Sequence, residues 1–482
     1  MAERMLKFTT IERRTPEKRE ARTRDRDFHE IYADFIDAKA QEQASRCSQC
    51  GVPFCQTHCP LHNNIPDWLR LTAAGRLEEA YRLSQATNAM PEICGRICPQ
   101  DRLCEGNCVI EQSGHGTVTI GAVERYLTDK AWEAGWVTPL KAHADVGQSV
   151  GVVGAGPAGL AAAEALREHG YAVTVYDRHD RPGGLLIYGI PGFKLEKDVV
   201  QRRTKRLEDG GVVFQMNFEV GRDATLPQLR ERHDAVLLAT GVYAARELEL
   251  PGTGSQGVVA ALDYLIASNR KGMGDEVPDY DSGLLDAQGK DVVVIGGGDT
   301  AMDCVRTAVR QGATSVTCLY RRDRENMPGS LREVSNAEEE GVVFEWLAAP
   351  RSLLGDVEGV SGVRAVRMRL GPPDSSGRRA PEPVEGSDFD LPAQLVIKAL
   401  GFDPEDLPTT LAAPDLAVSR WGTVNIDRKT QAANLDGVYA AGDIARGASL
   451  VVWAIRDGRD AADAIHNHLQ AKADAPALVA AE

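Results

Sequence analysis

Residues 149–177 read SVGVVGAGPAGLAAAEALREHGYAVTVYD, and this stretch decides the fold of the chain beyond its N-terminal third. The Val-rich start predicts a buried strand, residues 160–169 predict a helix, and residues 173–176 predict a second strand that ends at Asp177. The glycines of the intervening GAGPAG permit a tight turn and let a pyrophosphate approach the helix N-terminus. This order of elements predicts a dinucleotide-binding unit whose terminal acid accepts a hydrogen bond from a ribose hydroxyl.

A glycine-rich turn alone is a weak signal, because such turns are common in proteins. The complete unit of strand, turn, helix, strand and acid is far more specific. The residues of this unit that we expect to contact the cofactor are Gly154, Gly156, Pro157, Ala158, Gly159 and Asp177.

The same pattern recurs in residues 291–322, which read DVVVIGGGDTAMDCVRTAVRQGATSVTCLYRR. Here Tyr320 stands at the position that matches Asp177, and Arg321 and Arg322 follow it. Without an acid there is no repulsion of a 2′-phosphate, which a guanidinium can bind in bidentate fashion. The second unit therefore predicts an NADP site; the alternative is that both arginines are simply solvated in a charged loop. The expected NADP-contacting residues are Gly296, Gly297, Gly298, Asp299, Thr300, Arg321 and Arg322.

Two dinucleotide units in one chain predict one flavin and one nicotinamide cofactor. Residues 235–241 (AVLLATG) and 395–401 (LVIKALG) are matching apolar strands that end in glycine, one for each unit. Residues 436–443 (DGVYAAGD) bring a further acid beside a glycine, as in flavoproteins whose chain returns to the FAD domain. We therefore expect a split FAD domain, with the NADPH domain inserted between Pro251 and about Phe402.

Eight of the ten cysteines lie in the N-terminal third, in a C-x2-C-x4-C-x3-C run and a second group of four. They are Cys47, Cys50, Cys55, Cys59, Cys94, Cys98, Cys104 and Cys108. A cubane iron–sulfur cluster needs four thiolates that converge on one point, and short spacers on loops supply them. Eight thiolates therefore predict two 4Fe-4S clusters.

Two structural zinc sites are the alternative interpretation, since zinc also binds four-cysteine sets. Paired C-x2-C motifs are the usual zinc pattern, and only Cys47 and Cys50 have that spacing. A disulfide framework fits less well, because no secretory signal is present and we expect a reducing, cytoplasmic compartment. The distant Cys304 and Cys318 are expected to be small buried core residues.

Length and charge fit a multi-domain enzyme that binds neither nucleic acid nor membrane. The chain has 482 residues, which suits about three domains, and a net charge of −15, which disfavours nucleic-acid binding. The longest uncharged apolar stretch, 150–163, is too short and too rich in glycine to span a bilayer. Residues 1–28 are densely charged and predict a solvated arm or helix.

Helical periodicity marks the cysteine region, with one helical segment expected at 67–83 and another at 120–132. Residues 138–148 lose this periodicity and predict a linker. The fold class is thus α/β, with an α-helical iron–sulfur domain followed by two Rossmann-like domains. The expected boundaries are 1–145 for the cluster domain, 146–252 and 404–482 for the FAD domain, and 253–403 for the NADPH domain.

Five motifs together carry a resemblance to a known family. They are RCSQCGVPFCQTHCPLHNNIPDW (46–68), PEICGRICPQDRLCEGNCV (91–109), RPGGLLIYGIPGFKLEK (181–197), GGGDTAMDC (296–304) and VYAAGDIARGASLVVWAIRDGRDAA (438–462). Across nearly its whole length the chain resembles the small (β) subunits of NADPH-dependent glutamate synthase. A wider family includes the electron-input half of dihydropyrimidine dehydrogenase and NADPH–ferredoxin oxidoreductase subunits.

The resemblance implies which residues bind each group. It assigns one cluster to Cys47, Cys50, Cys55 and Cys108, and the other cluster to Cys59, Cys94, Cys98 and Cys104. The family's further FAD-contacting positions match Gly184, Leu185, Lys194, Gly442 and Asp443.

The resemblance also implies the reaction. NADPH would deliver a hydride to FAD, and the clusters would carry single electrons to a large (α) subunit that makes glutamate from glutamine and 2-oxoglutarate. We expect no acid–base catalytic residue, because the protein aligns two cofactors that react with each other.

Three alternatives remain. An NADPH–ferredoxin or pyrimidine-reducing subunit would share these motifs and differ in its electron acceptor. A thiol–disulfide reductase would need a cysteine pair near the flavin, and Cys304 and Cys318 lack that spacing. A nonenzymatic scaffold would not need two dinucleotide sites.

Overall fold

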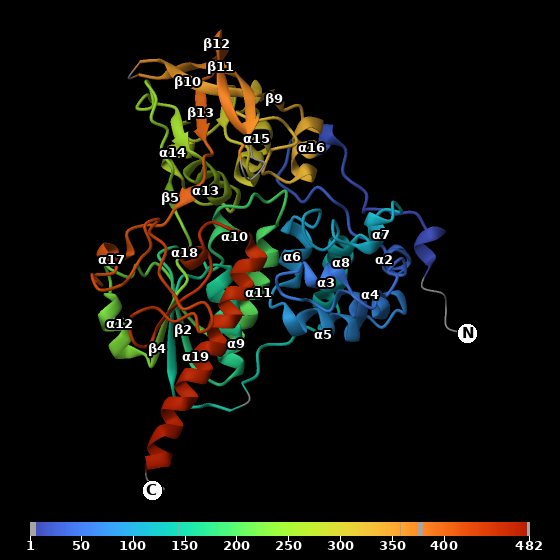
Figure 1. The fold of residues 1–482 in the computed structure, drawn as a ribbon, viewed down its shortest axis with the longest axis vertical. Coiled ribbons are helices and arrows are strands. Elements are labelled where there is room, and N and C mark those ends of the chain that lie inside the picture. Colours follow the sequence, from blue (N-terminus) through green and yellow to red (C-terminus); the bar gives the residue numbers. More distant parts are fainter. Residues whose placement is uncertain (1–5, 143, 357, 375–378, 480–482) are drawn as a thin grey trace.

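The computed structural model describes residues 6–142, 144–356, 358–374 and 379–479. The chain forms a lower lobe, which combines the N-terminal helices with the first Rossmann-like sheet, and an upper lobe that contains the second sheet (Figure 1). The predicted fold class is confirmed. Within the described residues, no helix has both the length and the apolar character needed to cross a membrane.

The N-terminal region consists of short helices joined by the loops that carry the cysteines. These elements are η1 (Lys7–Thr9), α1 (Ala21–Arg24), α2 (Asp37–Ala44), α3 (Phe54–Thr57), α4 (Ile65–Ala73), α5 (Leu77–Thr87), α6 (Pro91–Ile97), α7 (Val109–Gln112) and α8 (Ile120–Glu133). The expected helix at 120–132 is confirmed as α8. The single segment expected at 67–83 is wrong, because Gly75 has φ +74° and separates α4 from α5.

The first sheet is parallel, with strand order β15-β4-β1-β2-β3. Before the chain passes into the upper lobe, it forms β1 (Ser149–Val153), α9 (Pro157–Glu168), β2 (Ala172–Tyr176), α10 (Leu185–Tyr188), α11 (Lys197–Asp209), β3 (Val213–Gln215), α12 (Leu226–Arg232) and β4 (Ala235–Leu238). The returning chain adds α17 (Leu407–Thr410), β15 (Val438–Ala440), α18 (Asp443–Arg446) and α19 (Val451–Val479). Strand β15 pairs with β4, so segments from both ends of this region share one sheet.

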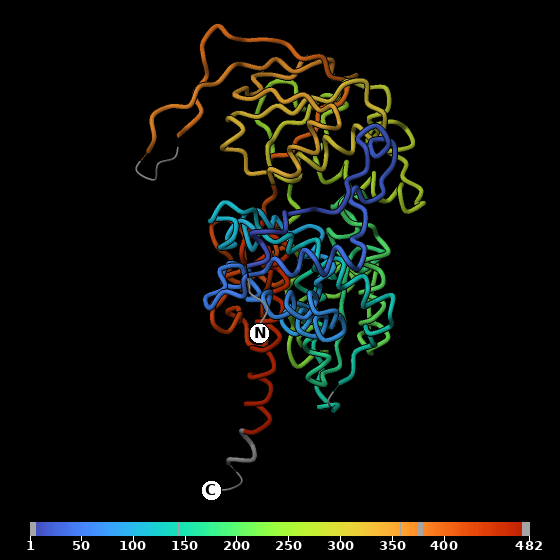
Figure 2. Tube along the Cα trace, turned by 90° about the vertical axis from the view of Figure 1, so that its right-hand side faces the viewer, coloured from blue at the N-terminus to red at the C-terminus, as the bar shows by residue number. Residues whose placement is uncertain are grey.

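The second sheet repeats this arrangement, in the order β6-β13-β7-β8-β9. Its elements are β6 (Val258–Ala260), α13 (Ala261–Gly272), α14 (Pro278–Asp281), β7 (Asp291–Ile295), α15 (Asp299–Gln311), β8 (Ser315–Tyr320), α16 (Leu331–Glu339), β9 (Val343–Trp346) and β13 (Leu395–Lys398). Three antiparallel strands project from this lobe: β10 (Ala348–Gly355), β11 (Val360–Pro373) and β12 (Arg379–Pro392). Figure 2 shows the hairpin of β11 and β12 reaching away from the body.

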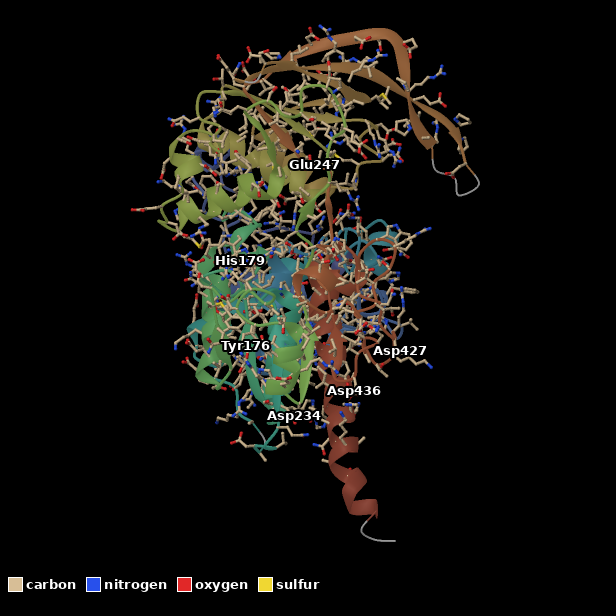
Figure 3. All side chains as sticks on the ribbon, turned by 90° about the vertical axis from the view of Figure 1, so that its left-hand side faces the viewer. Tyr176, His179, Asp234, Glu247, Asp427 and Asp436 are labelled. Atoms are coloured by element: carbon tan, nitrogen blue, oxygen red, sulfur yellow. The ribbon has the colours of Figure 1, made fainter. Side chains whose placement is uncertain are left out.

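A two-stranded ribbon joins the lobes. Its strands are β5 (Ala244–Ala245) and β14 (Phe402–Asp403), and they pair antiparallel over two residues. The chain therefore enters and leaves the upper lobe through one narrow connection. Figure 3 shows this arrangement, with Tyr176 and His179 labelled in the lower lobe and Glu247 in the upper lobe.

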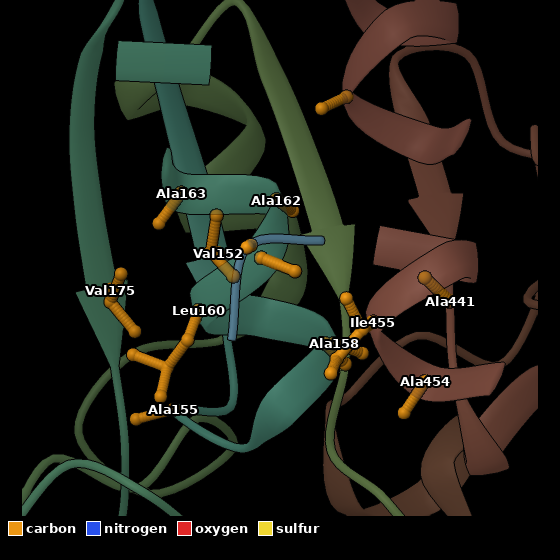
Figure 4. Close-up of a cluster of buried hydrophobic side chains, with 14 of the residues drawn as sticks. Val152, Ala155, Ala158, Leu160, Ala162, Ala163, Val175, Ala441, Ala454 and Ile455 are labelled. Carbon is orange, nitrogen blue, oxygen red and sulfur yellow. The ribbon is translucent and has the colours of Figure 1, made fainter. Parts of the chain in front are cut away.

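Small side chains allow close packing around the first glycine turn. Ala158 of α9 lies beside Ile455 of α19 (Figure 4), and Ala162 and Ala454 belong to the same buried cluster. Gly458 of α19 lies so close to α9 that a Cβ there would be 2.1 Å from the carbonyl oxygen of Ala158. This packing fixes the start of α19 beside the glycine turn.

The charged N-terminal segment differs from the solvated arm or helix that the sequence predicts. Arg24 is only 1% exposed and ion-pairs with Glu340 of the upper lobe. Charge density alone predicts a solvated segment, because a buried arginine needs a buried counterion, which the local sequence does not specify. The compensating carboxylate lies 316 residues further along the chain.

Candidate functional site

The first glycine turn opens into a cavity of about 200 Å³ at the carboxyl end of its sheet. Seven of the predicted FAD residues line it: Gly154, Gly156, Pro157, Ala158, Asp177, Leu185 and Asp443. The ends of β1 and β4 and the start of α19 thereby face the same space. Parallel sheets bind ligands at this edge, where the strand order reverses.

The glycines of this turn are of two kinds: some leave no room for a side chain, and one faces open space. At Gly154, with φ +110°, a Cβ would lie 2.3 Å from the carbonyl oxygen of Ala239, so a side chain is excluded. A Cβ at Gly159 would lie 1.9 Å from the carbonyl oxygen of Gly154. A Cβ at Gly156 would meet nothing within 4 Å, and that open space lies at the N-terminus of α9. A pyrophosphate placed there would face the free N–H groups and the positive end of the helix dipole.

Gly184 and Gly442 do not line the cavity themselves, but their backbone packs against the glycine turn that lines it. A Cβ at Gly184 would lie 2.8 Å from the Cα of Gly156, and one at Gly442 would lie 2.9 Å from the Cβ of Ala158. Both positions therefore keep the chain close to the glycine turn, which is how they bring Leu185 and Asp443 to the cavity.

Asp177 is held by hydrogen bonds from the protein itself. Its Oδ2 accepts from the backbone N–H of Ala155 at 2.7 Å, and its Oδ1 accepts from the backbone N–H of His179 at 2.9 Å. Burial would raise the pKa of Asp177, but the hydrogen bonds from His179 and Ala155 outweigh it and lower the pKa. The carboxylate is therefore charged and oriented, as an acceptor for a ribose hydroxyl must be.

Asp443 differs, because burial raises its pKa to about 7. It occupies the first position of α18, after Gly442, and lines the same cavity. Near neutral pH this carboxyl group can therefore accept or donate a hydrogen bond.

Several residues of this cavity are not predicted from the sequence. Tyr243 and Thr240 line it, and they also line an adjoining hollow of about 100 Å³ together with Arg178. The guanidinium of Arg178 lies 4.7 Å from the centre of the Tyr243 ring. The sequence gives one indication of these residues: Thr240 lies at the end of the AVLLATG motif, where a strand is expected to end.

Lys194, which the family resemblance assigns to FAD, does not line the cavity at the first glycine turn. Its Nζ donates to Oδ1 of Asp303 at 2.8 Å and lies 4.0 Å from Glu333, so both of its partners belong to the upper lobe. Lys194 lines a larger cavity between the lobes rather than the cavity at the first glycine turn. Its assignment to FAD stays a prediction.

The second glycine turn repeats the same geometry. At Gly296, with φ +147°, a Cβ would lie 2.2 Å from the carbonyl oxygen of Ala399. A Cβ at Gly297 would lie 2.4 Å from the Tyr320 ring, whereas one at Gly298 would meet nothing within 4 Å. Gly298 is the N-cap of α15, as Gly156 is of α9. The second turn therefore also leaves an open cradle at a helix N-terminus.

The other expected NADP residues lie at the start of α15 and directly after β8. Asp299 and Thr300 form the first turn of α15, and Oδ1 of Asp299 accepts from the backbone N–H of Ser330 at 2.9 Å. Arg321 is exposed directly after β8. The Nε of Arg322 is buried and has no hydrogen-bond partner among the described residues. A buried unpaired guanidinium nitrogen is costly, and an anionic ligand would satisfy it.

The structure brings four cysteines around one small hollow near the surface. They are Cys47, Cys50, Cys55 and Cys108, the set that the family resemblance assigns to one cluster. Burial raises the pKa of Cys47 to about 11 and that of Cys55 to about 12. Such thiols are protonated at neutral pH unless a metal centre replaces the proton. We call these four residues the outer set.

Of the other four cysteines, Cys94, Cys98 and Cys104 are buried and Cys59 is partly exposed, and we call these four residues the inner set. Cys94 and Cys98 belong to the buried cluster that includes Leu186 and Ile455 of the first sheet region, and Cys59 packs against that cluster. Burial raises the pKa of Cys59 to about 12, and the charge on Cys94 adds to the shift. The remaining member, Cys104, is 9% exposed and its pKa is raised by burial and by neighbours that include Cys59.

Each set supplies four thiol donors, the number that a 4Fe-4S cluster uses. Within the described residues, no three His, Cys, Asp or Glu side chains are close enough to share one metal ion. A cubane spreads its four thiolates over the corners of a larger body, so more widely spaced cysteines can hold it. Cys304 and Cys318 are fully buried in the core of the second sheet, as expected.

Comparison with known proteins adds to this geometry. Residues 24–136 match a family model described as dihydropyrimidine dehydrogenase domain II, 4Fe-4S cluster. Residues 148–458 match a model described as pyridine nucleotide-disulphide oxidoreductase. The chain is 66% identical over 480 residues to the glutamate synthase (NADPH) small chain of Azospirillum brasilense, a match that covers 100% of this chain and 99% of that protein.

This chain belongs to the family of glutamate synthase (NADPH) small chains. The small chain of Escherichia coli strain K12 is 47% identical over 475 residues, which cover 98% of this chain and all of that protein. The resemblance seen in the sequence motifs is thereby confirmed. The two family models divide the small chain into an iron–sulfur region and a pyridine nucleotide oxidoreductase region.

Solved structures support the fold of the oxidoreductase region. Mycobacterium tuberculosis FprA in complex with NADPH matches with a TM-score of 0.57 and 23% identity, over 68% of this chain and 86% of that one. Thioredoxin reductase of T. acidophilum matches with a TM-score of 0.50 and 19% identity, over 67% of this chain and 98% of that one. In the small chain, neither Cys304 nor Cys318 lines the cavity at the first glycine turn, so the thiol–disulfide alternative has no redox pair there.

Proposed function

We propose that this chain is the electron-input subunit of an NADPH-dependent glutamate synthase. It oxidises NADPH at FAD and delivers electrons, through two 4Fe-4S clusters, to a large subunit that forms glutamate from glutamine and 2-oxoglutarate. The inner cysteine set carries the proposal, because Cys94 and Cys98 share one buried cluster with Leu186, which lines the FAD cavity. This shared core offers a route out of the flavin site.

The chain's own residues bind and orient the two nucleotides. Gly156 and Gly298 leave room for a pyrophosphate at the N-termini of α9 and α15. Asp177 presents an oriented carboxylate to the FAD ribose. We assign recognition of the NADPH 2′-phosphate to Arg321 and Arg322, with the unpaired Nε of Arg322 as the supporting observation.

When bound, the cofactors supply the redox chemistry: hydride transfer from NADPH to FAD, followed by single-electron transfer. The protein contributes alignment and exclusion of water. Leu185, Leu450 and Val451 line the cavity with apolar surface. No side chain is assigned to proton transfer.

The two cysteine sets define a direction for electron flow. Cys94 and Cys98 of the inner set belong to the core of the FAD-binding region, whereas Cys47, Cys50 and Cys55 of the outer set are partly exposed. Phe54 and Val109 line the hollow of the outer set, and both are among the exposed large apolar residues, with 42% and 37% exposure. Nearby Val52 is 65% exposed. We infer that this rim, formed by Val52, Phe54 and Val109, is where the large subunit docks.

The proposed compartment is the cytoplasm. All ten cysteines are free thiols in the structure, which suits a reducing environment. Clusters and thiolate ligands also need protection from oxidation.

The direct test is metal and partner analysis of the protein purified without oxygen. We expect about eight irons per chain, with matching labile sulfide, from two four-iron clusters. We also expect copurification with a large glutaminase-bearing chain. Zinc in place of iron would overturn the cluster assignment. A ferredoxin or a pyrimidine-binding chain as the sole acceptor would overturn the glutamate synthase assignment while leaving NADPH oxidation in place.

A further inference from the structure

Residues 17–33 of the cluster-binding region form a closed loop, which we call the strap. Lys18 and Tyr32 are paired antiparallel at its base, where the backbone N–H of Arg19 donates to the carbonyl of Ile31 at 2.9 Å. Across the loop, Arg19 donates to both carboxylate oxygens of Asp27, at 2.9 and 2.5 Å. The strap is therefore a structured element rather than a free arm.

The base of the strap is fixed to both parts of the lower lobe. Oε1 of Glu30 accepts from Nε of Arg96, in the cluster-binding region, at 2.7 Å. The same oxygen accepts from the backbone N–H of Glu196, in the FAD-binding region, at 3.1 Å. Arg125 lies 3.2 Å from the other oxygen of Glu30. Glu30 thus ties the strap to two regions at once.

The tip of the strap reaches the upper lobe. Nε of Arg24 donates to Oε1 of Glu340 at 2.9 Å, and its Nη2 donates to Oε2 of Glu339 at 2.7 Å. Nζ of Lys18 donates to Oε1 of Glu339 at 2.6 Å. Figure 2 shows the blue N-terminal loop rising from the lower lobe alongside the second-sheet region. Glu339 and Glu340 end α16, so the strap holds this helix by its C-terminal end.

Glu340 also binds α15, the helix that begins at the NADP cradle. Its carboxylate also accepts from Arg306 at 2.9 Å and from Arg310 at 2.7 Å. Both guanidiniums stack on Phe193 of the FAD-binding region, 4.4 and 4.0 Å from the ring centre. One buried carboxylate therefore links the strap, the NADP helix and, through Phe193, the FAD-binding region.

The strap adds to other side-chain contacts between the lobes, such as those of Lys194 with Asp303 and of Arg181 with Asp275. The covalent connection is the narrow ribbon of β5 and β14. Beneath the strap the regions enclose a cavity of about 580 Å³, lined by charged residues that include Arg332 and Glu333. Polar interfaces between domains permit relative motion by default. A strap that spans the cavity can remove that freedom.

We propose that the strap is a positioning element, in which Lys18 and Arg24 hold the NADPH-binding lobe at the orientation that aligns the nicotinamide with the flavin. The inference rests on the proposed hydride transfer from NADPH to FAD. Hydride transfer requires the reacting atoms at about 3–3.5 Å, and a misplacement of about 1 Å can cost a hundredfold in rate. A few ion pairs far from the cofactors can therefore control the chemistry.

The test compares Arg24→Ala with Arg22→Ala in the complete holoenzyme. Both changes remove one arginine from α1, but Arg22 is exposed whereas Arg24 is buried. Stopped-flow reduction of FAD by NADPH gives the limiting rate and the apparent Kd for NADPH separately. We expect Arg24→Ala to lower the limiting rate about tenfold or more, with the Kd within twofold of wild type. Arg22→Ala should match the wild type.

A second readout does not depend on activity. In Arg24→Ala, amide hydrogen exchange in α16 and in the β5–β14 ribbon should accelerate, while FAD and iron contents stay at wild-type levels. Lys18→Ala removes the contacts with Asn336 and Glu339 at the base of the strap and should give a smaller loss of the same limiting rate, so it serves if Arg24→Ala does not fold.

Wild-type limiting rates in both Arg24→Ala and Lys18→Ala would overturn the proposal. So would a weaker Kd for NADPH with an unchanged limiting rate, since the strap would then affect binding only. Failure of the wild type to reduce FAD with NADPH would instead overturn the proposed function.

Discussion

Arg24 and Glu340 lie 316 residues apart in sequence and form a buried ion pair with a Nε–Oε1 distance of 2.9 Å. The two side chains are 1% and 0% exposed. Two further arginines share the same carboxylate, so removing Glu340 would take from Arg310 its carboxylate partner and from Arg24 and Arg306 one of two partners each. Breaking one member of a buried pair is much more costly than losing a surface pair.

The pH dependence of stability should reveal this carboxylate. Burial by itself would raise the pKa of Glu340, but the hydrogen bonds from Arg310 and Arg306 lower it from 4.5 to about 2. Because the folded pKa is the lower one, the stabilisation is complete above about pH 5 and is lost as the pH falls from 4.5 towards 2. Glu340→Gln should lower the free energy of unfolding by about 3–5 kcal/mol at pH 7.

Denaturant unfolding of the wild type and Glu340→Gln between pH 7 and pH 3 provides the measurement. The difference between them should shrink as the pH falls. Glu338→Gln is the control, since Glu338 is a partly exposed neighbour whose partner Arg324 is half exposed. A difference that stays constant with pH would mean that Glu340 is not charged in the folded protein.

Coenzyme choice should depend on the two arginines after β8. Changing both Arg321 and Arg322 to Ala should raise KM for NADPH far more than KM for NADH. Each lost charge-assisted contact is worth about 1.5–3 kcal/mol, which corresponds to roughly tenfold or more. Arg324→Ala, in the same loop, is the control because Arg324 pairs with Glu338. Steady-state kinetics with both coenzymes decide the matter, and equal effects on NADPH and NADH would show that the arginines do not contact the 2′-phosphate.

The apolar rim of the outer cysteine set should control assembly. Phe54→Glu places a charge on a side chain that is 42% exposed and lines the hollow of this set. We expect the affinity for the large subunit to fall tenfold or more, because buried aromatic anchors dominate such interfaces. Reduction of FAD by NADPH should continue. Trp421→Glu is the control, since Trp421 is 66% exposed and belongs to the FAD-binding region. Calorimetric titration measures both affinities, and an unchanged affinity for Phe54→Glu would place the interface elsewhere.

Local patterns made the two dinucleotide units predictable. Each strand, glycine turn and helix follows from residues that are adjacent in sequence, and the β1–β2 and β7–β8 pairs form as expected. The resemblance to a known family also supplied a partition of the cysteines, of which the outer set lines one hollow in the structure. Spacing alone could not supply this partition, because Cys108 joins the outer set while Cys59 leaves it for the inner set.

Long-range contacts were not predictable in the same way. The sequence of the strap is typical of a solvated segment, and the partner that buries Arg24, Glu340, is distant in sequence. Lys194 belongs to a motif that implies FAD contact, yet its partners Asp303 and Glu333 lie in the other lobe. Tyr243 reaches the FAD cavity from a loop with no distinctive composition. In each case the deciding partner is remote in sequence, and no local pattern encodes it.

The central claim, that electrons leave the flavin through the cysteine-bound clusters, is tested most directly with Cys50→Ser. Cys50 belongs to the outer set and does not line the cavity at the first glycine turn, so the change should impair one cluster without disturbing either nucleotide site. The measurement is stopped-flow reduction of FAD by NADPH, followed in the same holoenzyme preparation by glutamate formation. The account predicts that NADPH still reduces FAD at the wild-type rate while glutamate formation collapses. Full glutamate formation in a preparation that lacks the outer cluster would contradict it.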